Sequence, residues 1–302
     1  MEHTPVLLPE VITALNPKPG DVCVDGTVGG GGHAAELVRR SPGGMFLGID
    51  WNKNAVTRVR EKLTALVDRE GLAVTVNVVQ GNFSRLEDIV REELSGKRVD
   101  CLLLDLGLSS YELEEKMGFS YREDAPLIMR YDEDTAGLTA ARVVNEYDEK
   151  TLAHIFSEYG EERFAGRIAG SIVRERRKQP LYRTGELVQA VERALPHGHH
   201  SRRHAALRTF LALRLFVNKE RENLESALAA LPRIMAPQGR AAIISFHSLE
   251  DRIVKQALKL YGPPRLAASR REAGSGKPIR PGPKEIARNP RSRSAKLRIA
   301  MF

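Results

Sequence analysis

The stretch "VCVDGTVGGGGHAAEL", residues 22–37, passes from a short apolar run through an aspartate and four consecutive glycines into a helical pattern. An apolar run bounded by turn residues is typical of a buried strand, and the spacing after the glycines is typical of a helix. A strand, a glycine-rich turn and a helix in this order present backbone N–H groups to a ligand. We therefore expect a cofactor loop that binds a phosphate, a dinucleotide or an adenosyl group.

Three more apolar runs, at residues 44–50, 74–81 and 99–107, follow this one and alternate with helical patterns. Such alternation predicts an α/β domain built on a parallel, doubly wound sheet. Ligands of these sheets bind at the carboxyl ends of the strands, so the chemistry of the residues at those ends indicates the ligand.

Asp25, Asp50 and Asp105 close the first, second and fourth of these runs. Each aspartate alone is explained equally well as a loop or helix-cap residue. Three carboxylates at strand ends of one sheet are better explained by a ligand site than by packing.

The strand pattern stops near residue 110, gives way to successive helical patterns over 138–235, and resumes at 239–246 and 295–302. A sheet domain interrupted by a helical insertion is the simplest architecture with this order. The expected domains are residues 1–110 with 207–302 for the sheet and residues 111–206 for the insertion.

Charge is divided unevenly along the chain. Residues 1–160 carry 17 Lys and Arg against 27 Asp and Glu, whereas residues 161–302 carry 30 against 12. A basic half of this strength favours an anionic partner, of which nucleic acid is the usual one, over a merely solvated basic surface. Residues 262–294, rich in Pro, Gly, Ser and Arg, are expected to form either a long loop or a disordered segment that can order on such a partner.

The composition indicates a cytoplasmic protein without a membrane partner. No apolar run approaches the length of a membrane span, and the first residues lack a basic segment followed by an apolar one. The two cysteines, Cys23 and Cys101, lie in apolar strand patterns, which suits a reduced interior rather than a disulfide framework.

Two ligands of glycine-rich loops fit the sequence poorly. "GSGKP" at 274–278 has a proline where a phosphate-binding P-loop needs a hydroxyl. Residues 30–35 match the dinucleotide spacing, with Asp50 near the distance expected for a ribose contact. That match is weak, because Asp25 would then face a pyrophosphate.

S-adenosylmethionine suits the same residues better, since it carries an ammonium and a sulfonium and no phosphate. Asp25 and the glycine loop would hold its methionine end, and Asp50 would bind its ribose hydroxyls. Phe83, after the third strand, would pack on the adenine, and Asp105 would lie beside the methyl group.

Seven motifs together resemble the bacterial ribosomal small-subunit RNA methyltransferase H family (the MraW family): "HTPVLLPEV", "DGTVGGGGH", "LLLDLGLSS", "YGEERFAGRIA", "RTFLALR", "ISFHSLEDRIVK" and "NPRSRSAKLR", running from His3 to Arg298. The resemblance implies a class I (Rossmann-like) methyltransferase sheet with a helical insertion after the fourth strand. It also implies S-adenosylmethionine as cofactor and methylation of the exocyclic N4 of a cytosine in the decoding centre of small-subunit ribosomal RNA.

The resemblance places cofactor contacts on Gly31, Gly32, His33, Asp50, Phe83, Asp105 and, where the family has a glutamine, Glu112. Ile128 replaces a family acid and Leu211 a family glutamine, near where the target base is expected. Two alternatives therefore stay open: a divergent paralogue with another nucleic-acid target, and an RNA-binding or assembly protein that retains the fold without turnover.

Methylation at an exocyclic amine needs no covalent intermediate, because the nitrogen attacks the methyl group directly when it is held in line. Methylation at a ring carbon would require a cysteine nucleophile, and neither cysteine is placed for that role. The candidate catalytic residues are Asp105 and Ser109, as acceptors for the protons of the amine.

The expected substrate contacts are Ser110, Arg130, Arg208, His247, Arg291, Arg293 and Lys296. The last three basic residues are expected in an unstructured stretch. His247 is either a hydrogen-bonded structural residue or part of the acceptor pocket, beside a helix cap formed by Ser248 and Asp251. "HGHHSRRH" at 197–204 holds four of the eight histidines but no acid, so a basic RNA-contacting loop is expected there and no metal. We expect a monomer or a homodimer.

Overall fold

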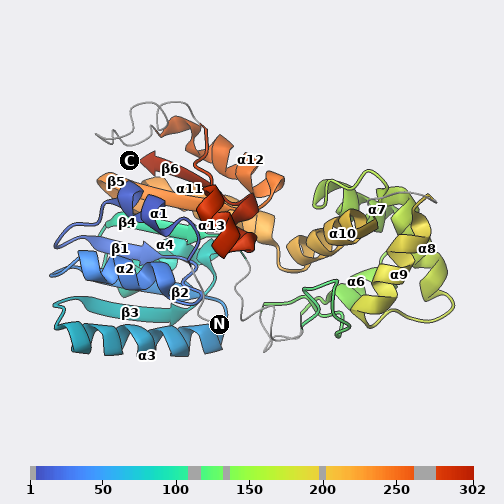
Figure 1. Ribbon diagram of the computed structural model, residues 1–302, viewed down its shortest axis with the longest axis horizontal. Coiled ribbons are helices and arrows are strands. Elements are labelled where there is room, and N and C mark those ends of the chain that lie inside the picture. The colour runs from blue at the N-terminus through green and yellow to red at the C-terminus, as the bar shows by residue number, and fades with distance from the viewer. Residues whose placement is uncertain (1–4, 108–116, 132–136, 197–201, 262–276) are drawn as a thin grey trace. The chain divides into compact units, whose positions relative to one another are not determined.

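The apolar runs expected to be strands form one sheet in the computed structural model, which describes residues 5–107, 117–131, 137–196, 202–261 and 277–302. The strands are β1 (Val22–Asp25), β2 (Met45–Asp50), β3 (Thr75–Gln80), β4 (Val99–Asp105), β5 (Met235–Ser245) and β6 (Lys296–Met301). They lie in the order β3-β2-β1-β4-β5-β6 (Figure 1). The first five are parallel, which confirms the predicted α/β class and its doubly wound order.

The sixth strand runs antiparallel to β5, where the sequence pattern predicted a parallel sheet. Lys296 pairs with Ser245, so β6 starts at the edge where β5 ends. This start is held by Asp251 in α12 (Ser248–Ala257), whose carboxylate accepts hydrogen bonds from Lys296 and Arg298. The direction of β6 therefore depends on contacts between residues far apart in the sequence.

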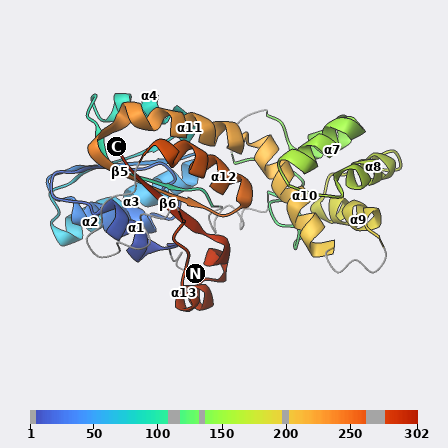
Figure 2. The same cartoon turned by 90° about the horizontal axis from the view of Figure 1, so that it is seen from above.

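Helices cover both faces of the sheet, as Figures 1 and 2 show. One face carries α1 (Leu8–Leu15), α2 (Gly32–Arg40) and α3 (Lys53–Glu70); the other carries α4 (Leu86–Glu93), α11 (Glu220–Ile234) and α12. Side chains of β4 alternate between the two cores: Cys101 and Leu103 pack toward α1–α3, and Leu102 and Leu104 toward α4, α11 and α12. This alternation is the period of a strand buried on both sides.

Close packing divides the chain into two units, Met1–Gly107 with Glu222–Phe302 and Leu108–Arg221. The second unit contains α6 (Ala140–Glu146), α7 (Glu149–Glu158), α8 (Ala165–Arg176), α9 (Thr184–Ala194) and α10 (Arg202–Val217). The domain boundary expected at residue 206 falls inside α10. Because Phe210 and Leu213 of this helix pack into the helical core with Phe156 and Leu187, the whole of α10 lies in the helical unit.

Part of the stretch expected to be a long loop is folded. Residues 262–276 lie outside the described residues, but α13 (Pro283–Arg288) and a 3-10 helix (Pro290–Ser294) follow them. Pro283 suits the first position of a helix because a proline has no N–H to leave unpaired there. The expectation of an unstructured segment is therefore wrong for residues 283–294.

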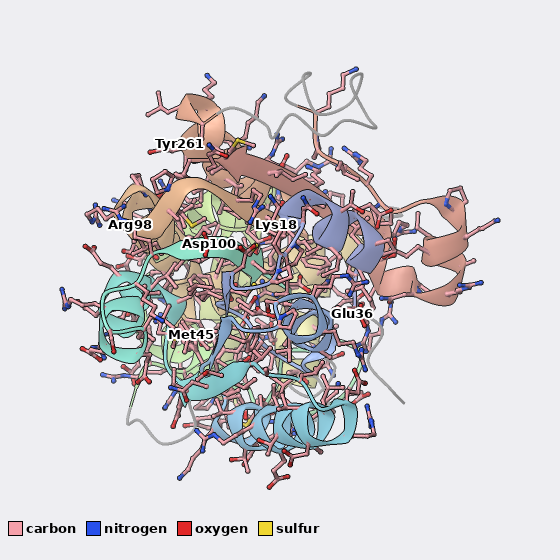
Figure 3. The ribbon with its side chains drawn as sticks, turned by 90° about the vertical axis from the view of Figure 1, so that its left-hand side faces the viewer. Lys18, Glu36, Met45, Arg98, Asp100 and Tyr261 are labelled. Atoms are coloured by element: carbon pink, nitrogen blue, oxygen red, sulfur yellow. The ribbon has the colours of Figure 1, made fainter. Side chains whose placement is uncertain are left out.

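The parallel strands begin at one edge of the sheet and end at the opposite edge. Figure 3 looks onto the edge at which the parallel strands begin, where Met45 of β2 and Asp100 of β4 are labelled. The carboxyl ends of β1, β2 and β4 lie at the opposite edge, so the expected site is on that side. In the described part of the chain, no helix is both long and apolar enough to cross a membrane.

Candidate active site

Three aspartates meet at the carboxyl edge of the sheet. Asp25, Asp50 and Asp105 are the last residues of β1, β2 and β4, and β1 pairs with both of the other strands. The strand order reverses between β1 and β4, since β2 and β3 lie on one side of β1 and β4 to β6 on the other. Crevices at such a reversal are where open α/β sheets bind their ligands.

The turn after β1 requires glycine at two positions for different reasons. A Cβ on Gly26 would come within 2.5 Å of Leu104 Cδ2, so a larger residue would push the turn away from β4. Gly31 has φ +70° and precedes α2, a left-handed conformation that other residues adopt at a cost. Gly32 is covered: its Cβ position lies 2.9 Å from Pro5. The backbone of the turn is therefore open at some positions and packed at others.

The turn is fastened to the strand ends by hydrogen bonds. Gly29 N donates to Asp50 Oδ2 at 2.8 Å, and Asn52 N donates to Asp50 Oδ1 at 3.0 Å. Thr27 N donates to Asp25 Oδ1 at 3.1 Å, and the backbone N of Asp105 donates to Thr27 Oγ1 at 2.6 Å. Sequence reasoning missed Thr27, although its place directly after the "DG" of the strand end was the available signal.

Burial changes the acidity of all three carboxyls. Desolvation, opposed by hydrogen bonds from Thr27 and reinforced by the charges of Asp105 and Asp50, raises the pKa of Asp25 to about 7. Desolvation, together with the charge of Glu250, also raises the pKa of Asp105 to about 7, against a backbone hydrogen bond from Gly107. The pKa of Asp50 is raised as well, again mainly by desolvation.

His33 and Phe83 lie beside this cluster. His33 is buried in the first turn of α2, with Nδ1 3.8 Å from Asp105 Oδ2 and Nε2 2.9 Å from the carbonyl oxygen of Val6. Phe83 opens the short 3-10 helix Phe83–Arg85 after β3, and its Cβ lies 3.7 Å from the Cβ position of Gly26. The structure thus brings together the expected cofactor residues of the first hundred positions.

The chemistry of this edge fits a cation better than a phosphate. Within the described residues, none of the three aspartates forms a salt bridge with a lysine or arginine. Asp105 Oδ1 is buried and has no hydrogen-bond partner among those residues. A cluster of desolvated carboxylates repels a pyrophosphate and attracts a sulfonium or an ammonium. The residues therefore fit S-adenosylmethionine, as the sequence predicted.

His247 has a structural role in the described part of the chain. It is the N-cap of α12: Glu250 N donates to His247 Nδ1, and Glu250 Oε2 accepts from the backbone of Phe246. The cap expected from Ser248 and Asp251 is therefore wrong. The pair His247 and Glu250 forms it instead, and the Asp251 carboxylate turns to β6.

The three basic residues expected to bind RNA together are not alike. Arg291 and Arg293 are exposed on the 3-10 helix Pro290–Ser294. Lys296 lies in β6 with its Nζ 2.9 Å from Asp251 Oδ2, and only a fifth of its side chain is exposed. The expectation that Lys296 lies in an unstructured stretch is wrong, because this ion pair holds it against the sheet.

The other expected contacts lie in the helical unit or outside the described residues. Arg208 Nη1 is 3.3 Å from Glu162 Oε2, a carboxylate that is fully buried. Arg130 is half-buried, and its guanidinium carbon lies 3.5 Å from the Cβ position of Gly137. Ser109, Ser110, Glu112 and the first five residues of the histidine-rich run 197–204 lie outside the described residues.

The chain is similar to known proteins over its whole length. The MraW methylase family matches residues 1–302. A protein of Symbiobacterium thermophilum named ribosomal RNA small subunit methyltransferase H is 44% identical over 99% of this chain and 96% of its own. Proteins of the same name from Heliobacterium mobile and Geobacter sulfurreducens are 44% and 43% identical over 99% of this chain, and each is covered to 98%.

Proposed function

The chain belongs to the MraW methylase family, and on that premise we propose that it transfers a methyl group from S-adenosylmethionine to small-subunit ribosomal RNA. The acceptor that we propose is the exocyclic N4 of a cytosine near the decoding centre. The names of the full-length relatives support the ribosomal RNA substrate. The observation that carries the chemistry is the cluster of desolvated carboxyls at the ends of β1, β2 and β4, which suits a cationic methyl donor.

When bound, S-adenosylmethionine supplies a methyl group that is activated by a positive sulfur. Asp50 accepts hydrogen bonds from the ribose, and the turn through Gly31, Gly32 and His33 lies along the methionine end. Asp25 lies beneath the turn and is 1% exposed. It therefore acts on the cofactor through its negative charge and not by direct contact. Phe83 flanks the adenine. Glu112 remains part of the proposed cofactor site.

The residues that we propose to orient the acceptor amine lie at and just after the carboxyl end of β4. Asp105 and Ser109 orient the amine, with Ser110 beside them. Arg130 and Arg208 belong to the helical unit Leu108–Arg221, which we assign to substrate binding. Together with Arg291 and Arg293 they contact the RNA. His247 supports the acceptor pocket through the helix cap that it forms. Lys296 is left out of the RNA contacts because Asp251 already holds its ammonium group.

The state of the two cysteines supports nitrogen as the acceptor. Cys23 and Cys101 are fully buried neighbours on β1 and β4. The hydrogen bond with Cys23 and burial raise the pKa of Cys101, so its thiolate is disfavoured. Carbon methylation would need a reactive thiolate. Two free thiols also agree with our proposal that the enzyme works in the reducing cytoplasm, as a monomer or a homodimer.

A transfer assay tests this function. Small subunits from a strain that lacks the gene are incubated with the full-length protein and S-adenosylmethionine labelled with tritium on its methyl group. We expect label in the small-subunit RNA with the wild-type protein, and a loss of about a hundredfold with Asp105→Ala, which corresponds to roughly 2.7 kcal/mol. Absence of label with the wild-type protein on any ribosomal RNA would overturn the proposal and favour a different nucleic-acid target.

A further inference from the structure

The orientation of His33 fixes where its protons are held. Its Nε2 lies 2.9 Å from the carbonyl oxygen of Val6. A carbonyl can only accept a hydrogen bond, so Nε2 must carry a hydrogen. The other ring nitrogen, Nδ1, faces Asp105 Oδ2 at 3.8 Å. In the neutral ring Nδ1 is then an acceptor, and it can interact favourably with Asp105 only if a proton is present on one of the two groups.

The Val6 carbonyl is held in place by residues distant in sequence. Leu7 is buried, with φ 54°, and its backbone N donates to Glu285 Oε1 of α13 at 2.7 Å. Pro5 packs on Gly32, the first residue of α2. The segment 5–7 is thus fixed on both sides. His33 cannot exchange its ring nitrogens without losing the bond to Val6.

The groups around Asp105 favour retaining a proton. Asp25 adds a negative charge from β1, and Glu250 adds one from the first turn of α12. At the end of β2, the negative charge of Asp50 raises the pKa of Asp25. The backbone N–H of Asp105 donates to Thr27 Oγ1, so it does not donate to the Asp105 carboxyl. His33 is the cationic partner available to Asp105 within 4.0 Å among the described residues.

We propose that His33 and Asp105 titrate as a coupled pair that carries one proton at neutral pH and that this pair accepts the proton released by the RNA amine. The second part rests on the proposed methyl transfer, whereas the first concerns the free protein. His33, which the family resemblance makes only a cofactor contact, then becomes a residue of proton transfer that acts through Asp105.

The proposed step balances in atoms and electrons. The lone pair of the amine nitrogen forms the bond to the methyl carbon, while the carbon–sulfur bond breaks and its electrons stay on sulfur. The nitrogen then carries a positive charge and loses one proton to Asp105 Oδ2. The pair, which held one proton, now holds two and returns one to solvent. At low pH both sites are already protonated, so the step requires a pH at which one site is vacant.

Nitrogen-15 NMR of the histidine rings in the ligand-free, full-length protein tests the first part. We expect His33 Nε2 to stay protonated from about pH 5 to 9 and Nδ1 to titrate in coupled steps with Asp105. In Asp105→Asn the neighbouring side chain cannot ionise, so the coupled steps should disappear and His33 should lose the anion that favours its charged form. The exposed His154 of α7 serves as the reference and should be the same in both proteins. An identical His33 titration in both proteins, or a ring with Nδ1 as its protonated nitrogen, would overturn the proposal.

The variant His33→Gln tests the second part, because its amide can still donate to Val6 while it lacks Nδ1. We expect kcat, measured at saturating S-adenosylmethionine, to fall about a hundredfold, within the range of general acid–base groups. The acid limb of the kcat–pH profile should also move. An unmoved limb would contradict proton transfer by the pair. Failure of the wild-type enzyme to methylate RNA would instead sink the proposed function and leave the NMR result standing.

Discussion

The backbone N of Asp105 lies 2.6 Å from Thr27 Oγ1, so a threonine of the turn after β1 holds the end of β4. The same residue donates its own N–H to Asp25 Oδ1. Two of the three aspartates are therefore positioned by one residue, through its backbone N–H and its hydroxyl. The turn therefore holds the ends of β1 and β4 in position, in addition to providing an open backbone for the cofactor.

Replacing Thr27 by valine should impair turnover more than binding. Valine keeps the shape and leaves the Asp105 N–H unpaired, which costs about 1–3 kcal/mol and lets the strand end move. We expect kcat for methyl transfer to fall about tenfold or more, with RNA affinity unchanged. Thr27→Ser keeps the hydroxyl and should retain most activity. Equal activity of the valine and serine variants would show that the hydroxyl does not position Asp105.

Replacing Asp50 by alanine should weaken cofactor binding. Charge-assisted hydrogen bonds to the ribose are worth about 1.5–3 kcal/mol. The expected loss of S-adenosylmethionine affinity is therefore about ten- to a hundredfold, as measured by calorimetry. Asp68→Ala, an exposed aspartate near the end of α3, is the matched control and should bind as the wild type does. Binding of NAD in place of S-adenosylmethionine would overturn the cofactor assignment.

Replacing Asp25 by asparagine should stabilise the fold at high pH. The pKa of Asp25 is about 7 in the folded protein, above its ordinary value of 3.8, so the unfolded chain loses this proton at lower pH. The free energy of unfolding therefore falls as the pH rises from about 4 to 7 and is constant in this respect above that.

Asparagine removes this dependence and keeps the oxygen that accepts from Thr27. Relative to wild type, we expect Asp25→Asn to gain up to about 4 kcal/mol between pH 4 and pH 8 in urea denaturation, since each pKa unit is worth about 1.4 kcal/mol. The matched exposed variant Asp68→Asn should show no such trend. A stability difference that is the same at both pH values would contradict the burial of a charged Asp25.

Removing the arginines of the 3-10 helix Pro290–Ser294 should reduce the salt dependence of RNA binding. The slope of log affinity against log salt falls by roughly 0.7–0.9 for each phosphate that the protein no longer neutralises. The double variant Arg291→Ala, Arg293→Ala should therefore bind RNA more weakly and with a shallower slope, measured by filter binding at several salt concentrations.

Two other lysines separate this effect from a general loss of charge. Lys97 is exposed just before β4, at the edge of the sheet where the strands begin, and Lys97→Ala should leave the slope unchanged. Lys296→Ala breaks the ion pair with Asp251 and should lower stability rather than the slope. A double variant with the wild-type slope would show that the two arginines do not contact phosphates.

The sequence was sufficient where the pattern is local. The alternation of apolar runs predicted the parallel strands. The aspartates that end those runs lie together at one edge of the sheet, as expected, because in this fold strand ends meet there. The features that the sequence did not predict depend on contacts between segments that are distant in the chain. Asp251 is held by Lys296 and Arg298, so it cannot cap α12, and His247 with Glu250 takes that place.

Thr27 and α10 show the same limit. A threonine in a turn has many local hydrogen-bond partners, and only the pairing of β1 with β4 brings Asp105 N to its hydroxyl. The apolar residues of α10 fit either unit by their spacing alone, and the helical core that they contact fixes where the second boundary falls.

Identification of the methylated nucleoside tests the central claim most directly. Small-subunit RNA labelled by the wild-type protein, and by Cys23→Ser and Cys101→Ser, is digested and its nucleosides are analysed by mass spectrometry. The account predicts cytidine methylated on N4, at comparable levels with all three proteins once their folding is verified, because direct transfer to nitrogen uses no thiol. A product methylated on carbon, or loss of the product in a well-folded cysteine variant, would contradict it.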